Sequence, residues 1–188
     1  MKILAIDTET TGKPISWHGA VNDLDNWPRI IELAWELFDE NGRTIQEKSF
    51  LIKPDGWKVP DGEFWQEHGF TTEKCEAEGT AMPEVLNYFT AAVRTADIMV
   101  AHNMSFDYPI INCEMLRYGK RAKRIKTYCT KEESTPICGI LGPAGKNKWP
   151  TLAEAYTFFT GKQPENAHHA LADVKMCKEV YLSIQDLV

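Results

Sequence analysis

The sequence predicts an α/β domain whose sheet contains strands of mixed direction. The length of 188 residues suits one domain, and 43% hydrophobic with 26% charged residues is ordinary for a globular chain. Residues 31–37 alternate apolar and polar side chains and lead into Asn41-Gly42, a strong hairpin signal. Beyond residue 80, helical spacing of apolar side chains is interrupted by a short strand-like stretch. We therefore expect a single domain over residues 1–188.

The first part of the chain is expected to form three antiparallel strands. Residues 2–7 are an apolar run that ends in an acid, which is typical of a buried strand. Residues 12–28 contain several glycine, proline and asparagine residues and predict a loop. The alternating stretch 31–37 and the β-rich stretch 44–53 then follow as two strands joined by the Asn-Gly turn.

The middle of the chain predicts a helix, a strand and a second helix. Apolar side chains recur at helical spacing over residues 82–93, with Pro83 in the first turn. Residues 97–101 form a brief apolar strand. Ser105 can cap a helix that continues to about Tyr118.

The last part of the chain predicts a long loop followed by two helices. Residues 133–150 contain several glycines and prolines and are expected to be an inserted loop. Thr151 caps a helix that ends near Thr160 at Gly161. A final helix has one apolar stripe, made of Ala170, Val174, Cys177, Tyr181 and Ile184.

Charge, apolar runs and cysteines limit the function classes. The net charge of −6 is unlike that of proteins that hold nucleic acid by bulk electrostatics, but it allows an acidic metal site beside a local basic patch. No apolar run approaches the ~20 residues that span a bilayer, and the N-terminus has no signal-peptide pattern. Five cysteines, an odd number without a Cys-x-x-Cys pair, predict reduced thiols. We expect a cytoplasmic protein without a membrane or a stable protein partner.

Two acids stand at the end of the first predicted strand. Asp7 and Glu9 are two residues apart, so their side chains project from the same face of an extended chain. Neighbouring carboxylates are unfavourable unless a cation neutralises them, and carboxylate oxygens suit Mg²⁺ or Mn²⁺. A solvated loop with two acids is the alternative.

Two further acidic segments follow. Asp107 lies in the first turn of a predicted helix, where an acid can simply interact with the helix dipole. Asp173 lies in the last helix, preceded by His168 and His169, which alone predicts no more than a surface cluster. Together the three segments offer four carboxylates and a histidine at strand ends and helix starts. Such a set can hold two divalent cations, and a histidine can deprotonate an attacking water.

The order and spacing of Asp-Thr-Glu-Thr-Thr-Gly, His-Asn-x-x-Phe-Asp and His-x-x-x-x-Asp resemble the DnaQ-like (DEDDh) 3′–5′ exonuclease family. The resemblance implies an RNase H-like fold, with a mixed five-stranded sheet flanked by helices on both faces. It implies that two divalent cations bind Asp7, Glu9, Asp107 and Asp173, with His168 as the general base. His169 is the lesser candidate for that base.

The implied reaction is release of 5′-mononucleotides from the 3′ ends of single-stranded nucleic acid, with DNA expected rather than RNA. Two alternatives stay open: an RNA-trimming exonuclease of the same chemistry, and a non-catalytic module that binds nucleic-acid ends or docks on a polymerase. The family motifs imply a set of nucleic-acid contacts at Thr8, Thr10, Thr11, Gly12, Asn103, Phe106 and His68.

Two other features bear on substrate binding. Residues 117–126 contain six cations and no acid, which predicts a contact with the nucleic-acid backbone, although a solvated surface is the simpler explanation. Of the six tryptophans, Trp35 is expected in the core and the others in loops, where one or two can stack on bases. Lys13 stands where the family often has an apolar side chain.

Overall fold

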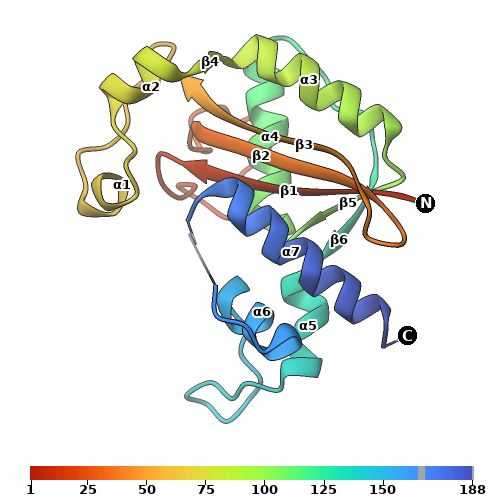
Figure 1. Ribbon diagram of the computed structural model, residues 1–188. Coiled ribbons are helices and arrows are strands. Elements are labelled where there is room, and N and C mark those ends of the chain that lie inside the picture. The colour runs from red at the N-terminus through yellow and green to blue at the C-terminus, as the bar shows by residue number, and fades with distance from the viewer. Residues whose placement is uncertain (165–167, 188) are drawn as a thin grey trace.

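The computed structural model describes residues 1–164 and 168–187, and it contains a mixed sheet with helices on both faces (Figure 1). The strands lie in the order β4-β3-β2-β1-β5-β6. Their bounds are β1 Lys2–Thr10, β2 Ile30–Asp39, β3 Thr44–Lys53, β4 Thr80–Ala81, β5 Ile98–Ala101 and β6 Lys126–Cys129. Strands β1, β2 and β3 are antiparallel, whereas β5 is parallel to β1 and β6 to β5. The predicted α/β class and the antiparallel unit are confirmed.

The sheet has six strands in the described residues, one more than the resemblance implied. The two strands that the sequence did not indicate are β4 and β6, at the two edges. Strand β4 has only two residues, too few for any periodicity, and three of the four residues of β6 are exposed or half-buried. Short edge strands have little apolar patterning, because much of their surface faces solvent.

The helices are α1 Glu63–Glu67, α2 Thr72–Glu78, α3 Met82–Thr95, α4 Met104–Arg117, α5 Thr130–Cys138, α6 Leu152–Thr160 and α7 Ala170–Gln185. No element was expected over residues 63–78, where α1 and α2 lie. The expectation of a loop over 133–150 is wrong for its first six residues, which belong to α5. Helix α4 begins one residue before Ser105, with Asn103 at its N-cap position. Thr151 and Gly161 bound α6 as predicted.

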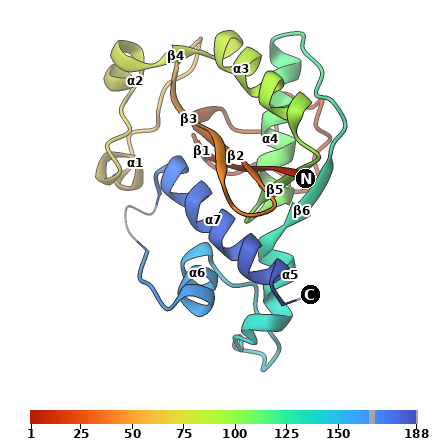
Figure 2. The ribbon, with the colours of Figure 1, turned by 45° about the vertical axis from the view of Figure 1, so that its right-hand side comes forward.

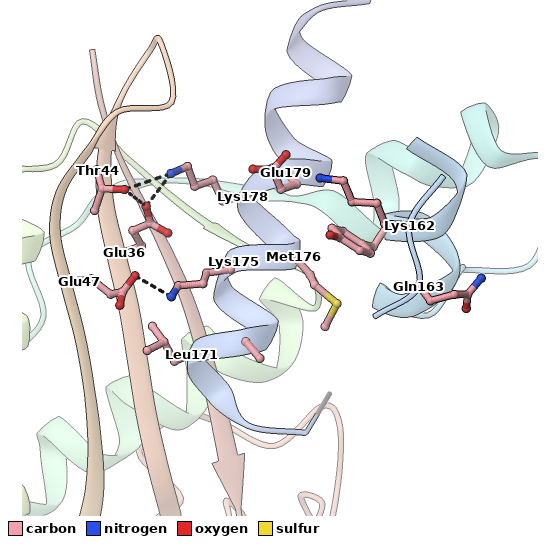
Figure 3. A pocket seen from close by; sticks show the side chains of 12 residues that line it. Glu36, Thr44, Glu47, Lys162, Gln163, Leu171, Lys175, Met176, Lys178 and Glu179 are labelled. Carbon is pink, nitrogen blue, oxygen red and sulfur yellow. Dashed lines mark hydrogen bonds and ion pairs between the residues drawn. The ribbon is translucent and has the colours of Figure 1, made fainter. Parts of the chain in front are cut away.

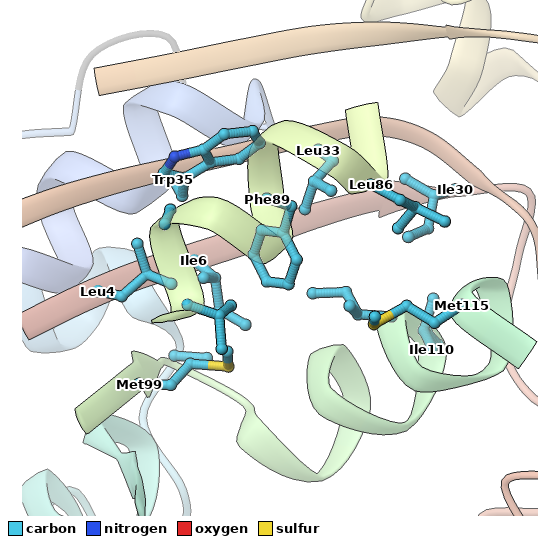
Figure 4. Packing of buried hydrophobic residues seen from close by; sticks show 14 of the residues in the cluster. Leu4, Ile6, Ile30, Leu33, Trp35, Leu86, Phe89, Met99, Ile110 and Met115 are labelled. Carbon is cyan, nitrogen blue, oxygen red and sulfur yellow. The ribbon is translucent and has the colours of Figure 1, made fainter. Parts of the chain in front are cut away.

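Strand β1 separates two apolar layers. Leu4 and Ile6 pack on one face of the sheet with Phe89 of α3 and Ile110 of α4 (Figure 4). Ile3 and Ala5 point to the other face, where they pack against the apolar stripe of α7. Figures 1 and 2 show the same division, with α3 and α4 on one side of the sheet and α7, α5 and α6 on the other. The stripe predicted for the last helix is buried throughout.

The loop between β1 and β2 is fastened to α4 by a buried ion cluster. The Glu114 side chain has no exposed surface, and its Oε1 accepts hydrogen bonds from Arg29 Nε at 2.7 Å and Arg117 Nη1 at 3.0 Å. Arg117 Nη2 also donates to the carbonyl oxygens of Leu24 and Trp27. Removing one partner from such a buried cluster costs ~3–5 kcal/mol, because the remaining charge is left uncompensated.

Among the described helices, none combines the length and apolar character that crossing a membrane requires.

Candidate active site

The first strand carries the row of side chains that leads into the site. Ile3 and Ala5 face α7, so the alternation of an extended strand places Asp7 and Glu9 on the same side, beyond the apolar core. This is the shared face that their spacing predicts. The site therefore begins where the buried row of β1 changes from apolar to acidic.

Asp107 approaches from α4, on the opposite side of the sheet. It is 3% exposed, and its Oδ1 accepts hydrogen bonds from Thr8 N at 3.1 Å and Thr8 Oγ1 at 2.8 Å. Thr8 is buried as well, so its hydroxyl, which the family motif implied as a nucleic-acid contact, orients Asp107 in this structure. Because β1 and β5 are parallel, the strand end that carries Thr8 lies beside the start of α4.

Helix α7 brings Asp173 to the site, and His168 lies two residues before the first residue of this helix. One ligand atom each from Glu9, His168 and Asp173 lies within 4.8 Å of the other two. His168 adopts a positive φ of 69°, a conformation that non-glycine residues seldom adopt and that clusters at functional sites. The Oδ1 atom of Asp173 is buried and has no hydrogen-bond partner among the described residues.

Burial and mutual repulsion raise the pKa of all four acids. Burial, followed by the charge of Asp107, raises the pKa of Asp7 well above its usual range. Burial raises the pKa of Glu9 to about 8, with Asp173 as the strongest neighbouring charge. Burial also raises the pKa of Asp107 to about 7 and that of Asp173 to about 6. A cluster that prefers to retain protons is one that a cation stabilises in its ionised form.

The donor set fits divalent cations. Four carboxylates supply the hard oxygen ligands that Mg²⁺ and Mn²⁺ prefer, and the unpaired Asp173 Oδ1 is a buried acceptor for which the described protein atoms supply no donor.

Sequence reasoning did not identify Glu32, which belongs to the same cluster. It pairs with Glu9 across β1 and β2, and its charge helps to raise the pKa values of Asp7, Glu9 and Asp173. Its Oε2 accepts a hydrogen bond from the backbone N–H of Ala170, the first residue of α7, at 3.1 Å. Glu32 thereby fixes the start of the helix that carries Asp173. Its alternation within the strand at 31–37 was visible, but its pairing with Glu9 was not.

Two neighbouring histidines lie in different surroundings. The His168 ring lies 4.8 Å from that of His68 and 5.6 Å from that of Phe64, measured between centroids, so α1 and its end flank it. Burial, then the two nearby histidines, lowers the pKa of His168. His169 instead stands at the N-cap position of α7 and faces Phe70.

The remaining residues of the first motif form a hydrogen-bonded turn after β1. Thr10 Oγ1 donates to Gly12 O at 2.8 Å, and Thr11 Oγ1 accepts from Arg29 N at 3.0 Å. Trp65 Nε1 donates to Thr10 O at 3.0 Å, which ties α1 to the same turn.

The second motif, which begins at His102 and Asn103, serves partly to hold the structure together. Asn103 Oδ1 accepts a hydrogen bond from Lys131 Nζ at 2.5 Å. His102 is buried between Thr130 Oγ1 and Pro150 O, and burial lowers its pKa to about 4. Neutral His102 therefore links the end of β5 to α5 and to the loop before α6.

A large groove lies away from these acids. This groove of about 1120 Å³ follows the outer side of α7, where Lys175 pairs with Glu47 and Lys178 with Glu36 (Figure 3). None of the four acids of the site lines it. Its charged groups are largely paired with each other, so we assign the groove a structural role and not a ligand-binding one.

Comparison with known proteins identifies the class of this chain. Residues 4–181 match the RNase_T family, described as exonuclease. The chain belongs to this family, and its enzyme class is 3′–5′ exonuclease, as the three motifs predicted.

Individual relatives agree with this class. The DNA polymerase III epsilon subunits of Salmonella typhimurium and of Buchnera aphidicola from Acyrthosiphon pisum are 25% and 29% identical. Each alignment covers 96% of this chain, and 70% and 71% of those proteins respectively.

Solved structures share the fold. Escherichia coli Exonuclease I with a dT13 oligonucleotide superposes with a TM-score of 0.75 at 16% identity over 96% of this chain. Exonuclease I from Methylocaldum szegediense gives 0.75 at 18% identity over 98%. This chain spans only 40% of either Exonuclease I chain.

The raised pKa values predict how stability depends on pH without metal. The folded state holds protons that the unfolded state has already released above about pH 4.5, so stability of the metal-free protein falls as pH rises from about 5 to 8. Glu9→Gln removes part of this penalty. In EDTA, the Tm of this variant should exceed that of wild type by ~3–6 °C at pH 8.5 and by much less at pH 5.

The measurement is thermal unfolding across this pH range, with exposed Glu76→Gln in α2 as the control. Equal Tm values for Glu9→Gln and wild type at pH 8.5 would contradict the prediction. Addition of Mg²⁺ should stabilise wild type more than the variant, because the cation neutralises the same carboxylates.

Proposed function

We propose that this protein is a metal-dependent 3′–5′ exonuclease that shortens single-stranded DNA and releases 5′-mononucleotides. The observation that carries the proposal is the convergence of one buried and three half-buried acids of raised pKa with a histidine at the end of β1. Asp7, Glu9, Asp107 and Asp173 would hold two divalent cations, Mg²⁺ or Mn²⁺. When bound, such cations stabilise the charge that develops on the attacking and leaving oxygens of a phosphoryl displacement.

The protein side chains divide the remaining work. Asp7 is central, because its pKa is raised by each of the other three acids. Thr8 holds Asp107 toward this centre, and Glu32 holds the start of α7. His168 accepts the proton of the attacking water on an imidazole nitrogen. Its lowered pKa supports this role, since the ring stays neutral at physiological pH.

Two observations favour this reading over the alternatives. A non-catalytic module has no need of a strained His168 beside two acids, whereas a hydrolase does. DNA is favoured over RNA as substrate because the aligned relatives are DNA polymerase subunits, and because the superposed Exonuclease I structures hold dT13 and dA16 oligonucleotides. An exoribonuclease of the same chemistry is the second candidate.

Cleavage of matched DNA and RNA strands tests the proposal. Wild type should convert a 5′-labelled single strand into a ladder that shortens from the 3′ end with Mg²⁺ or Mn²⁺, and not in EDTA. Asp7→Ala and Asp173→Asn should each lower the rate by at least ~10³-fold, because each removes a cation ligand. Circular dichroism should show both variants folded.

Retained cleavage in either variant would refute the assignment of these acids. Faster shortening of RNA than DNA would select the exoribonuclease. Binding of both strands without cleavage under any metal would support the non-catalytic module.

The two histidines give a second test. His168→Ala should lower kcat by ~10²–10⁴-fold while the Mg²⁺ concentration for half-maximal activity changes little, because a general base contributes this much to rate. His169→Ala is the matched control and should keep most of the activity. If His169→Ala has the larger effect on kcat, the general base is His169.

The cationic side chains of segment 117–126 are not equally available to bind a ligand. Arg117 is engaged with Glu114 and with backbone carbonyls, so it is not available for phosphate. Lys120 Nζ donates to Asn87 Oδ1, and Arg121 and Lys123 are both exposed. We propose that Lys120, Arg121 and Lys123 contact the DNA backbone beyond the active site.

Charge reversal tests this contact. Lys120→Glu, Arg121→Glu and Lys123→Glu combined should weaken DNA binding and reduce the slope of log K against log salt by ~2, since each lost phosphate contact removes ~0.7 for a single strand. The measurement is fluorescence anisotropy in EDTA at several salt concentrations. An unchanged slope would refute the contact.

A further inference from the structure

The loop over residues 11–29 has a fixed shape. Asn26 is 5% exposed, its Oδ1 accepts from Ser16 N at 2.7 Å, and its Nδ2 donates to Ser16 O at 3.0 Å. The backbone N–H of Ile15 donates to Asn26 O at 2.9 Å. A Cβ at Gly19 would lie 2.2 Å from Asn26 Nδ2, so the turn closes tightly around this amide. Together with the Glu114 cluster, these contacts hold both halves of the loop.

This fixed loop presents apolar side chains to solvent. Ile15 is 84% exposed and Trp17 is 50% exposed. In contrast, the indole N–H groups of Trp27, Trp35 and Trp65 each donate to a partner within the protein. Large apolar side chains on a rigid, polar-rimmed surface mark interaction sites.

The exposed indole adjoins the active site. The Trp17 ring lies 5.8 Å from the ring of Phe106 between centroids, at an interplanar angle of 42°. Phe106 immediately precedes Asp107 in the first turn of α4. The two rings therefore form an aromatic surface next to the acids, with one ring from each of two separate elements.

A separate groove, which has neither Trp17 nor Phe106 in its lining, lies beside the same loop and α4. It measures about 400 Å³ and is lined by Val21 of the same loop, by Tyr108 and Leu116 of α4, and by Lys120 and Arg121 beyond its end. Helix α4 has 14 residues and is thus ~20 Å long, the length of several nucleotides. The groove therefore has apolar side chains beside α4 and cationic side chains beyond the end of this helix. This arrangement suits a nucleic-acid strand, because its bases stack on apolar surfaces and its phosphates are anionic.

We propose that Trp17, backed by Phe106, is a base-stacking platform for an unpaired nucleotide of the substrate, whose upstream strand follows this groove. The inference rests on the proposed function and adds a determinant for unstacked, single-stranded ends. Trp17 is a binding and positioning residue and takes no part in the chemistry. Its contribution depends on a base being present.

The test compares Trp17→Ala, Trp17→Phe and the control Phe158→Ala, whose ring is 52% exposed on α6. Substrates are a 5′-labelled single strand and the same strand with three abasic nucleotides at its 3′ end. Trp17→Ala should lower kcat/KM on the normal strand by about 5- to 20-fold, mainly through KM, since stacking on an aromatic ring is lost. Trp17→Phe should keep most of the wild-type kcat/KM, and Phe158→Ala should match wild type.

The abasic strand isolates the role of the base. On the abasic strand, the difference between Trp17→Ala and wild type should shrink below twofold. An equal loss on both strands would mean a structural effect of the substitution and would overturn the platform, as would an unchanged KM on the normal strand. Retained cleavage by Asp7→Ala would instead refute the proposed function, whatever Trp17→Ala does.

Discussion

The structure depends on a repulsive interaction, the crowding of carboxylates at the end of β1. Two unit charges 4 Å apart repel by ~4 kcal/mol at an effective dielectric constant of 20, and a whole domain is stable by only ~5–15 kcal/mol. Repulsion of this kind acts on Asp7 and Glu9, whose pKa values are raised by the charges of Glu32 and of the other motif acids. Protons or divalent cations must therefore relieve the repulsion, and the raised pKa values of Asp7 and Asp107 express this requirement.

The scaffold withstands this repulsion because each acid is supplied by an element anchored elsewhere. Strand β1 has apolar layers on both faces before it reaches Asp7. Helix α7 is fixed by its buried stripe, and its first N–H is held by Glu32. Asp107 is oriented through Thr8 rather than through its own helix. The result is a site whose geometry is set by distant packing, as preorganised electrostatic catalysis requires.

Local sequence patterns predicted the fold class and pointed to the four acids of the candidate site. They failed where the structure depends on contacts between residues that are far apart in the sequence. Strand alternation was enough to place Asp7 and Glu9 on one face, because that period is a local property. Glu32 could not be assigned, since its register with Glu9 is set across an irregular loop. The short helices α1 and α2 have five and seven residues, too few for an amphipathic pattern. The role of Arg117 was likewise hidden, because its partners lie far away in sequence.

The loop between β1 and β2 is held in place by contacts that lie outside the acidic site. Its anchors are Asn26 within the loop and Glu114 on the far part of α4, and neither belongs to the acidic cluster. The exposed side chains of Ile15 and Trp17 take no part in those anchors, to which Ile15 contributes only its backbone N–H. The side chains at the tip of this loop can therefore change, in evolution or in a mutant library, without a change in the acidic site.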